Sequence, residues 1–155
     1  MVPGGAAGCD ATDPRLVVRD LATGAQRSWA AAAGATILQL SWNPDGDSLA
    51  YELSQGSAIS IHVLAVDGAE QSVAAGVIDV SPPAGCTYGL PRFMAGTPDL
   101  LLALNCLGKS AALVTYNLDN HSAQPLVAVA AGDVYGIVDL SVDTSGQHII
   151  GVLSS

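Results

Sequence analysis

The amino-acid sequence predicts an all-β protein built from antiparallel hairpins. Three segments carry this prediction, and each reads as a strand, a short turn and a second strand: SWNPDGDSLAYEL (41–53), RFMAGTPDLLLAL (92–104) and SVDTSGQHIIGVL (141–153). Their first residues are 51 and then 49 positions apart. Apolar residues recur at every second position along both arms of the first segment, which is the period of a strand with one buried face.

The first of these inner hairpins has the residues of a tight turn. Pro44 presets φ at the second turn position, and Gly46 supplies a positive φ. Before the turn, Leu38, Leu40 and Trp42 occupy alternate positions. We therefore expect Trp42 to share their face and to be buried between neighbouring sheets. In the second segment, the proline-first turn is replaced by the sequence Ala-Gly-Thr-Pro (95–98).

A second kind of hairpin alternates with the first. These outer hairpins are LVVRDLATGAQRSW (16–29), ISIHVLAVDGAEQSV (59–73) and ALVTYNLDNHSAQPLVAV (112–129), with turns at 22–24, 66–68 and 119–121. The sequence thus predicts about twelve short strands. The alanine-rich stretch at 29–35 is too short to sustain a helix without support.

Four-stranded antiparallel units that repeat every ~45 to 50 residues are typical of a β-propeller. The segments DLATG, LSWNPDGDSLAYEL and VLAVDG resemble blades of WD-repeat-like and TolB-like bacterial propellers. The resemblance covers 16–153 and implies a fold and a general binding habit, but it carries no catalytic residues onto this chain. We expect a flexible amino-terminal segment (1–15) followed by about three four-stranded propeller blades (16–155).

Charge excludes several classes of partner. The chain has 5 basic and 14 acidic residues, a net charge of -9. Nucleic-acid binding requires a basic stripe that displaces counterions, and none can be assembled here. The longest apolar runs are far shorter than a membrane span, so membrane insertion is not expected. The amino-terminal residues do not combine a basic start with an apolar stretch, so no signal peptide is expected.

Ser48 lies in the sequence Gly-Asp-Ser-Leu (46–49), which surrounds a nucleophilic serine in one hydrolase family. A nucleophilic serine needs an exposed elbow, a base and an orienting carboxylate. Here Ser48 directly follows a tight turn, and no Asp-x-x-His pair occurs near the carboxyl end. We therefore interpret Ser48 as the first residue of a strand, and we expect no catalytic residues.

Metal and cofactor sites are not expected either. Asn43, Asp45 and Asp47 have the spacing of calcium-loop ligands, but Ser48 and Ser54 stand where such a loop needs glycine and glutamate. The three histidines are spread over different hairpins without zinc-ligand spacing. The amino-terminal glycines lack the preceding strand and the lysine of a phosphate loop.

Cys86 and Cys106 flank the second inner hairpin. If that hairpin turns about residues 96–97, the two cysteines are one residue out of direct register, which in a regular ladder puts their side chains on opposite faces. A bulge would correct the offset and allow a disulfide. Two free thiols are the alternative, since disulfides also need an oxidising compartment. Cys9 remains without a partner.

The expected function is that of a non-catalytic interaction or scaffolding module that binds a protein partner through loops between blades. Those loops lie around 30–36, 81–88 and 131–135, where Tyr88 and Tyr135 are candidate contacts, because tyrosine offers area and a polar tip. Packing of both tyrosines between blades is the alternative. The rival functions are the propeller portion of a larger hydrolase and a carbohydrate-binding module.

The hairpins at 16–29 and 137–153 together supply the strands of one further blade. Three blades are fewer than the four to eight of ordinary propellers. We expect these hairpins to pair between two chains, giving a homodimer that completes a six-bladed ring, or to pair with a segment of a longer parent. The expected location is extracytoplasmic or secreted, with the cytoplasm as the alternative.

Overall fold

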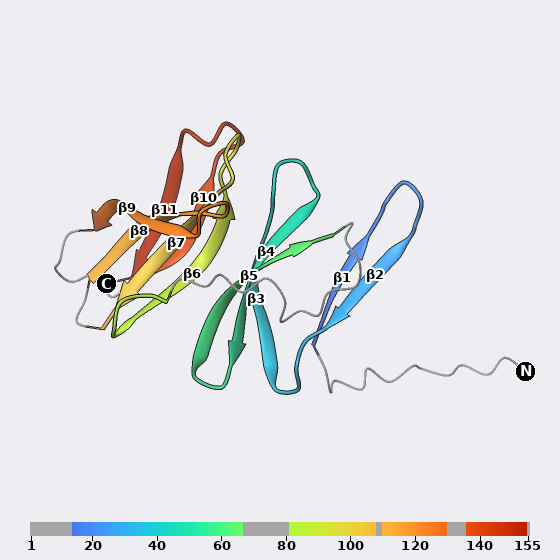
Figure 1. Ribbon diagram of the computed structural model, residues 1–155, viewed down its shortest axis with the longest axis horizontal. Coiled ribbons are helices and arrows are strands. Elements are labelled where there is room, and N and C mark those ends of the chain that lie inside the picture. Colours follow the sequence, from blue (N-terminus) through green and yellow to red (C-terminus); the bar gives the residue numbers. More distant parts are fainter. Residues whose placement is uncertain (1–13, 67–80, 108–109, 130–135, 155) are drawn as a thin grey trace, which may run out of the picture.

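The protein is described by a computed structural model that covers residues 14–66, 81–107, 110–129 and 136–154. Within these ranges the regular structure is antiparallel β-sheet, which confirms the predicted all-β class (Figure 1). Sheet 1 contains β1 (Arg15–Arg19) and β2 (Gln26–Ala30); sheet 2 contains β3 (Ala35–Trp42), β4 (Ser48–Gln55) and β5 (Ala58–Ala65); sheet 3 contains β6 (Cys86–Phe93), β7 (Asp99–Cys106), β8 (Ser110–Asn117) and β9 (Ser122–Val129); sheet 4 contains β10 (Gly136–Val142) and β11 (Ile149–Ser154).

The strand pairing follows the order of the chain. Within each sheet every strand pairs with the next one along the sequence, so the sheets are simple meanders without crossovers. Sheet 3 has the four strands expected of one repeat unit, whereas three are described in sheet 2. Several predicted features lie outside the described residues, namely the amino-terminal segment up to residue 13, most of the 66–68 turn and the loop at 131–135.

Three apolar clusters join the four sheets in sequence. Leu16 and Trp29 of sheet 1 pack with Leu49, Tyr51 and Leu53 of sheet 2. The opposite face of sheet 2 packs on sheet 3, and the opposite face of sheet 3 packs on sheet 4. The sheets are therefore packed in a row that follows the order of the chain; Figure 1 shows sheet 1 at one side of the molecule and sheets 3 and 4, which overlap in this view, at the other.

The second strands of the first two inner hairpins, β4 and β7, are buried on both faces. In β7, Leu100 and Leu102 face sheet 2, while Leu101 and Ala103 face sheet 4, and all four are fully buried. Such a strand reads as a continuous apolar run instead of an alternating one. This explains why the segment Leu-Leu-Leu-Ala-Leu (100–104) lacks polar interruptions.

The first strand of each inner hairpin contains a register shift. The shift lies between Leu38 and Leu40 in β3, between Gly89 and Arg92 in β6, and between Ile137 and Asp139 in β10. An extra residue in one strand of a pair bends the strand and redirects the side chains that follow it. Within the first two shifts, Gln39 has a φ of 33° and Leu90 a φ of 54°.

The prediction that Trp42 is buried on the face of Leu38 and Leu40 is wrong. Because of the shift, Leu38 lies opposite Glu52 while Leu40 lies opposite Tyr51, so Leu38 faces away from the other two. Leu40 and Trp42 lie on the side of sheet 1, but they remain 55% and 47% exposed. Among the described residues sheet 1 has two strands, and the apolar cluster that they form with sheet 2 does not include Leu40 or Trp42.

Polar side chains fasten neighbouring sheets at these first strands. The buried carboxylate of Glu52 in β4 accepts a hydrogen bond from the Leu90 backbone N–H, 3.1 Å away, at the shift in β6. Asn105 in β7 binds both backbone groups of Ile137 in β10, at 2.8 and 3.1 Å. Each contact satisfies backbone groups at the irregular part of a strand, where the ladder cannot.

Truncation of a residue in the doubly buried strands should be costly. We expect Leu102→Ala to lower the free energy of unfolding by about 2–5 kcal/mol, because it leaves a cavity between two packed sheets. Leu21→Ala is the matched control, since Leu21 is 94% exposed and its truncation should change stability by less than about 0.5 kcal/mol. Urea unfolding monitored by circular dichroism measures both, and equal effects would contradict the two-faced packing.

Candidate functional site

The turns of the three inner hairpins form one continuous surface, which we call the turn face (residues 43–47, 94–98 and 143–147). Figure 1 shows these three turns along the same edge of the molecule. The second and third turns are in close contact, since a Cβ placed on Gly146 would lie 3.1 Å from the Ala95 backbone nitrogen. A groove described below joins the first turn to the second.

The first turn is held by the side chain of Asn43. Its Oδ1 accepts hydrogen bonds from the backbone N–H groups of Asp47 and Ser48, both at 3.0 Å. Its Nδ2 donates to Asp47 Oδ1 at 2.7 Å, and Gly46 has the positive φ that the turn requires. Ser48 opens β4, as predicted, and its hydroxyl donates to Asp47 Oδ1 at 2.8 Å.

The third turn repeats this arrangement with an aspartate. Asp143 Oδ1 accepts hydrogen bonds from the backbone N–H groups of Gln147 and His148, while Oδ2 contacts the Ser145 hydroxyl and His148 Nδ1. The Ser145 hydroxyl and the His148 backbone N–H are the largest causes that hold the pKa of Asp143 well below its usual value. Hydrogen bonds to the ionised form of a carboxyl favour that form.

The second turn uses different residues. Met94 stands where the other turns have Asn43 and Asp143, and positive φ occurs at Gly96, one position earlier than in those turns. Thr97 Oγ1 accepts a hydrogen bond from the Asp99 backbone N–H at 3.3 Å. The sequence Ala-Gly-Thr-Pro (95–98) therefore forms a turn of the same length as the first turn. Its glycine is one position earlier, and the apolar Met94 replaces the amide or carboxylate of the other two turns.

Two grooves lie between the turns. The larger has a volume of about 510 Å³ and lies between the first and second turns. Its floor is made by half-buried apolar side chains and its rim by exposed turn residues; it is lined by Asn43, Pro44, Asp45, Ser48, Val63, Phe93, Met94, Gly96, Thr97, Pro98 and Leu118. The smaller, of about 390 Å³, brings together residues of β3, β6 and β10 with residues of all three turns.

Arg92 supplies the positive charge in the smaller groove. Its Nε donates to the Leu140 carbonyl at 2.7 Å, and one terminal nitrogen donates to Gln39 Oε1 at 3.2 Å. The guanidinium also lies 3.7 Å from the Asp139 carboxylate. Arg92 thus links the first strands of three successive sheets.

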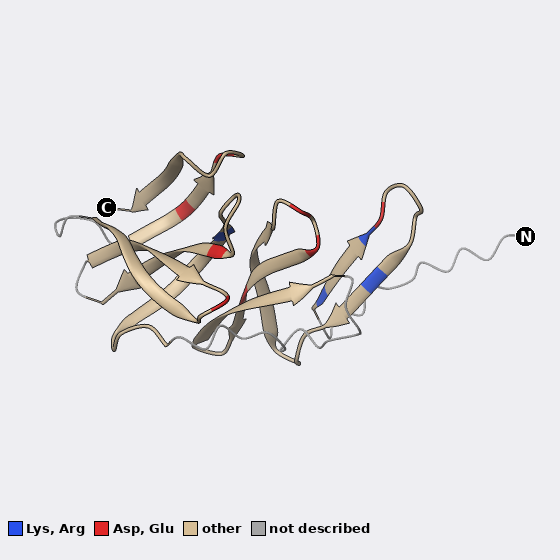
Figure 2. Ribbon diagram, turned by 45° about the horizontal axis from the view of Figure 1, so that its top comes forward, with Lys and Arg blue, Asp and Glu red and all other residues tan. Residues whose placement is uncertain are grey.

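The turn face is otherwise acidic. Asp45, Asp47 and Asp143 lie on its first and third turns, and Figure 2 shows their red segments on the exposed loops. Three of the five basic residues, Arg15, Arg19 and Arg27, lie instead on the β1–β2 hairpin. Electrostatic attraction at the turn face therefore favours a positively charged ligand.

Tyr88, a predicted contact residue, lies on β6. It is half-buried against the apolar cluster between sheets 2 and 3, and this burial raises its pKa. Tyr135, the second predicted contact, lies outside the described residues. In the loop at 30–36, Ala31 and Ala35 are buried in the cluster between sheets 1 and 2.

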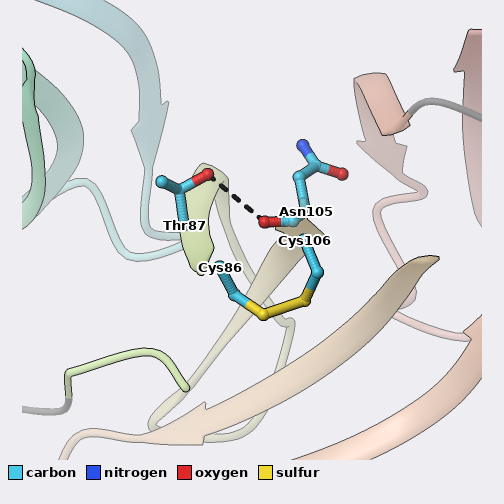
Figure 3. The surroundings of a disulfide bond; sticks show 4 residues. All are labelled: Cys86, Thr87, Asn105 and Cys106. Atoms are coloured by element: carbon cyan, nitrogen blue, oxygen red, sulfur yellow. Dashed lines mark hydrogen bonds between the residues drawn. A yellow bond between two sulfur atoms is a disulfide. The ribbon is translucent and has the colours of Figure 1, made fainter. Parts of the chain in front are cut away.

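Cys86 and Cys106 are joined by a disulfide and lie directly opposite each other in β6 and β7 (Figure 3). The shift between Gly89 and Arg92 moves the pairing by one residue, so that the offset expected for a regular ladder disappears. The bridge joins the ends of β6 and β7 that lie away from their turn. Cys9 lies outside the described residues.

The histidines have separate structural surroundings. His62 on β5 is buried and stacked on Tyr51, with ring centroids 5.3 Å apart. His121 occupies a turn with a φ of 55°, and its Nδ1 lies 3.1 Å from the Tyr116 hydroxyl. Over the described ranges, no group of three or more His, Cys, Asp or Glu side chains is placed to hold a metal ion.

Comparison with known proteins gives no family. A search against models of protein families found no match, and a search of curated protein sequences also found none. No helix in the described part of the chain has the length and apolar character needed to cross a membrane.

Sequence reasoning missed the turn face as a surface. The residues of each turn were identified, but the joining of the three turns depends on the packing of successive sheets. A signal was nevertheless present: an Asn or Asp at the first position of the first and third turns, with glycine three residues later.

The ionised side chain of Asp143 should stabilise the third turn. Because its folded pKa lies below the usual 3.8, its contribution is present above that value and is lost as the pH falls through the folded pKa. We expect Asp143→Asn to lower the melting temperature at pH 7, and the difference from the wild type to shrink as the pH falls from 4 to 2.

Asp119→Asn is the control for that experiment. Asp119 is an exposed turn residue whose carboxylate has no hydrogen-bond partner among the described residues, so its variant should melt like the wild type at each pH. A constant difference between Asp143→Asn and the wild type across this range would contradict the assigned role.

Removal of the disulfide should destabilise the second inner hairpin. The bridge spans 20 residues, and closing a loop of that length stabilises a fold by about 3 kcal/mol. We expect the double variant Cys86→Ser, Cys106→Ser to lose about this much in urea unfolding, whereas Cys9→Ser should lose none. Mass spectrometry without reduction should show the peptide that contains Cys86 linked to the peptide that contains Cys106. Detection of three free thiols would exclude the bridge.

Proposed function

We propose that this chain forms part of a β-propeller and acts as a non-catalytic interaction module that binds a protein partner at the turn face. The single observation that carries the proposal is the groove of about 510 Å³ between the first and second turns. It combines half-buried apolar side chains below with exposed polar groups around it, which is the usual composition of a recognition surface.

The propeller architecture is supported by the arrangement of the sheets. Successive meanders pack face to face, and the first strands β3, β6 and β10 are neighbours. Arg92 on β6 contacts both β3 and β10, as expected if the three strands line a common axis. Radial repetition of four-stranded meanders is the organisation of a propeller.

The chemistry of the groove indicates what kind of segment it binds. Phe93, Met94 and Leu118 supply an apolar floor, and Asp45 supplies a carboxylate at the rim. An extended peptide with apolar residues next to lysine or arginine matches both features. The loops at 30–36 and 81–88 belong to the opposite ends of the inner hairpins and are secondary candidates for contact.

Disulfide bonding supports an extracytoplasmic location for this activity. Disulfides form and persist mainly in oxidising compartments. The Cys86–Cys106 bridge also anchors β6, which supplies part of the groove floor.

Charge reversal at the groove tests the proposal. We expect peptides selected from a random library on the wild-type chain to contain basic and apolar residues, and to bind the Asp45→Arg variant about tenfold more weakly, equivalent to about 1.4 kcal/mol. Asp119→Arg is the matched control, because it makes the same charge change on an exposed turn outside the groove. Fluorescence anisotropy with labelled peptides measures each affinity.

Two results would contradict this function. If the selected peptides bind the Asp45→Arg variant and the wild type with equal affinity, the groove is not their binding site. Turnover in a broad hydrolase screen, reproduced by independently purified protein, would favour the portion of a hydrolase over an interaction module.

A further inference from the structure

Two apolar surfaces are uncovered at opposite ends of the row of sheets. On sheet 4, Ile150 is 71% exposed, Val138 is 54% exposed and Val152 is 50% exposed. On sheet 2, beside sheet 1, Leu40 and Trp42 are similarly exposed. Large apolar surfaces of this kind mark interaction sites in soluble proteins.

Sheet 4 is equivalent to the first half of sheet 3. Its turn is closed by a hydrogen bond from the Asp143 N–H to the His148 carbonyl, as Met94 bonds to Asp99 in sheet 3. By this equivalence, Ile150 and Val152 of β11 take the places of Leu101 and Ala103 of β7. In sheet 3 those two places are fully buried, because sheet 4 covers them.

Sheet 1 is equivalent to the second half of sheet 3. Asp20 Oδ1 accepts hydrogen bonds from the backbone N–H groups two and three residues later. Asn117 Oδ1 accepts the same two hydrogen bonds at the β8–β9 turn. Four residues after these acceptors, Gly24 and His121 have φ values of 75° and 55°. The β1–β2 hairpin therefore corresponds to β8–β9.

We propose that β11 of one copy pairs with β1 of a second copy, completing a four-stranded sheet in the order β10, β11, β1, β2. The pairing of β7 with β8, in which Leu102 lies opposite Val114, fixes the register. Transferred to the new junction, it places Gly151 opposite the partner's Val17 and Val152 opposite the partner's Leu16. Main-chain pairing at strand edges is a common mode of association.

This register brings the two apolar surfaces together. Leu16 faces sheet 2 within its own chain, so Val152 of the other copy would face the same sheet and cover the exposed Leu40 and Trp42. In sheet 3 the position of Trp42 is occupied by Phe93, which packs against sheet 2. Trp42 is thus exposed in one copy because its cover belongs to the second.

A polar contact between sheets would be repeated at the junction. The Phe93 backbone N–H donates to Ser41 Oγ in the preceding sheet at 3.2 Å. In the repeat, Trp42 takes the place of Phe93, and Ser141 takes the place of Ser41. The Trp42 N–H would then donate to the hydroxyl of the partner's Ser141.

The charges at the two ends are of opposite sign. Arg15, Arg19 and Arg27 lie on the β1–β2 hairpin, whereas Asp139 and Asp143 lie at the other end, on β10 and on the turn after it (Figure 2). Complementary charge speeds the encounter of the β1–β2 hairpin of one copy with sheet 4 of another, and it disfavours pairing of two identical ends.

Two such junctions close a pair of copies with two-fold symmetry. Each copy then contributes sheets 2 and 3 and half of two shared sheets, six in all, within the four to eight of a closed propeller. The ring form rests on the proposed propeller, whereas the edge pairing rests only on the equivalence of the hairpins, and neither depends on what the groove binds.

Light scattering coupled to size exclusion tests the pairing across a dilution series. We expect a mass twice the 15.6 kDa of the chain, and we expect Val152→Asp to raise the dissociation constant at least tenfold. Val127→Asp is the matched control: Val127 on β9 is 51% exposed, like Val152, and lies outside the junction. A wild type that remains monomeric at all concentrations would overturn the proposal, as would equal effects of the two variants.

A cross-link tests the register without relying on the stability of a variant. In a Cys9→Ser background, Arg15→Cys together with Leu153→Cys should give a covalent dimer on oxidation, because these two residues lie opposite each other across the proposed junction. Either substitution alone should give none. A link within one chain, or no link under conditions where wild type is dimeric, would overturn the register.

Discussion

Burial of β4 and β7 on both faces is the constraint on which the rest of the structure depends. A strand that is apolar on both sides can be stable only between two other sheets, so each of the first two inner hairpins requires a neighbouring sheet before it and after it. The clusters around Leu101 and Leu102 satisfy this on opposite faces of β7. The row of sheets follows from this requirement, since no sheet in it could bury its apolar residues alone.

Contacts between successive sheets occur at the irregular parts of the first strands. Each register shift leaves backbone groups outside the ladder, and side chains of the preceding sheet bind two of the shifted strands, as Glu52 does at Leu90 and Asn105 at Ile137. The same shift in β6 aligns Cys86 with Cys106. Bulge, inter-sheet contact and disulfide are therefore parts of one local arrangement.

The proposed functions use surfaces that the fold leaves free. Asn43 and Asp143 satisfy the backbone of their own turns, so the outer surface of the turn face can vary without loss of the hairpins. The apolar surfaces around Trp42 and Ile150 are different, because they belong to faces that are buried elsewhere in the same repeat. Their exposure supports pairing of two copies of the chain, whereas the groove supports binding of another protein.

The all-β class, the hairpins and their turns were determined by the sequence itself, because alternation and turn residues act over a few neighbouring positions. Ser48 as the first residue of a strand belongs to this local class. The exposure of Trp42, the pairing of Cys86 with Cys106 and the joining of three turns into one face were decided only by tertiary structure. The physical reason is that a single inserted residue reverses the face of the side chains that follow it, and where bulges form depends on contacts between sheets far apart in the chain.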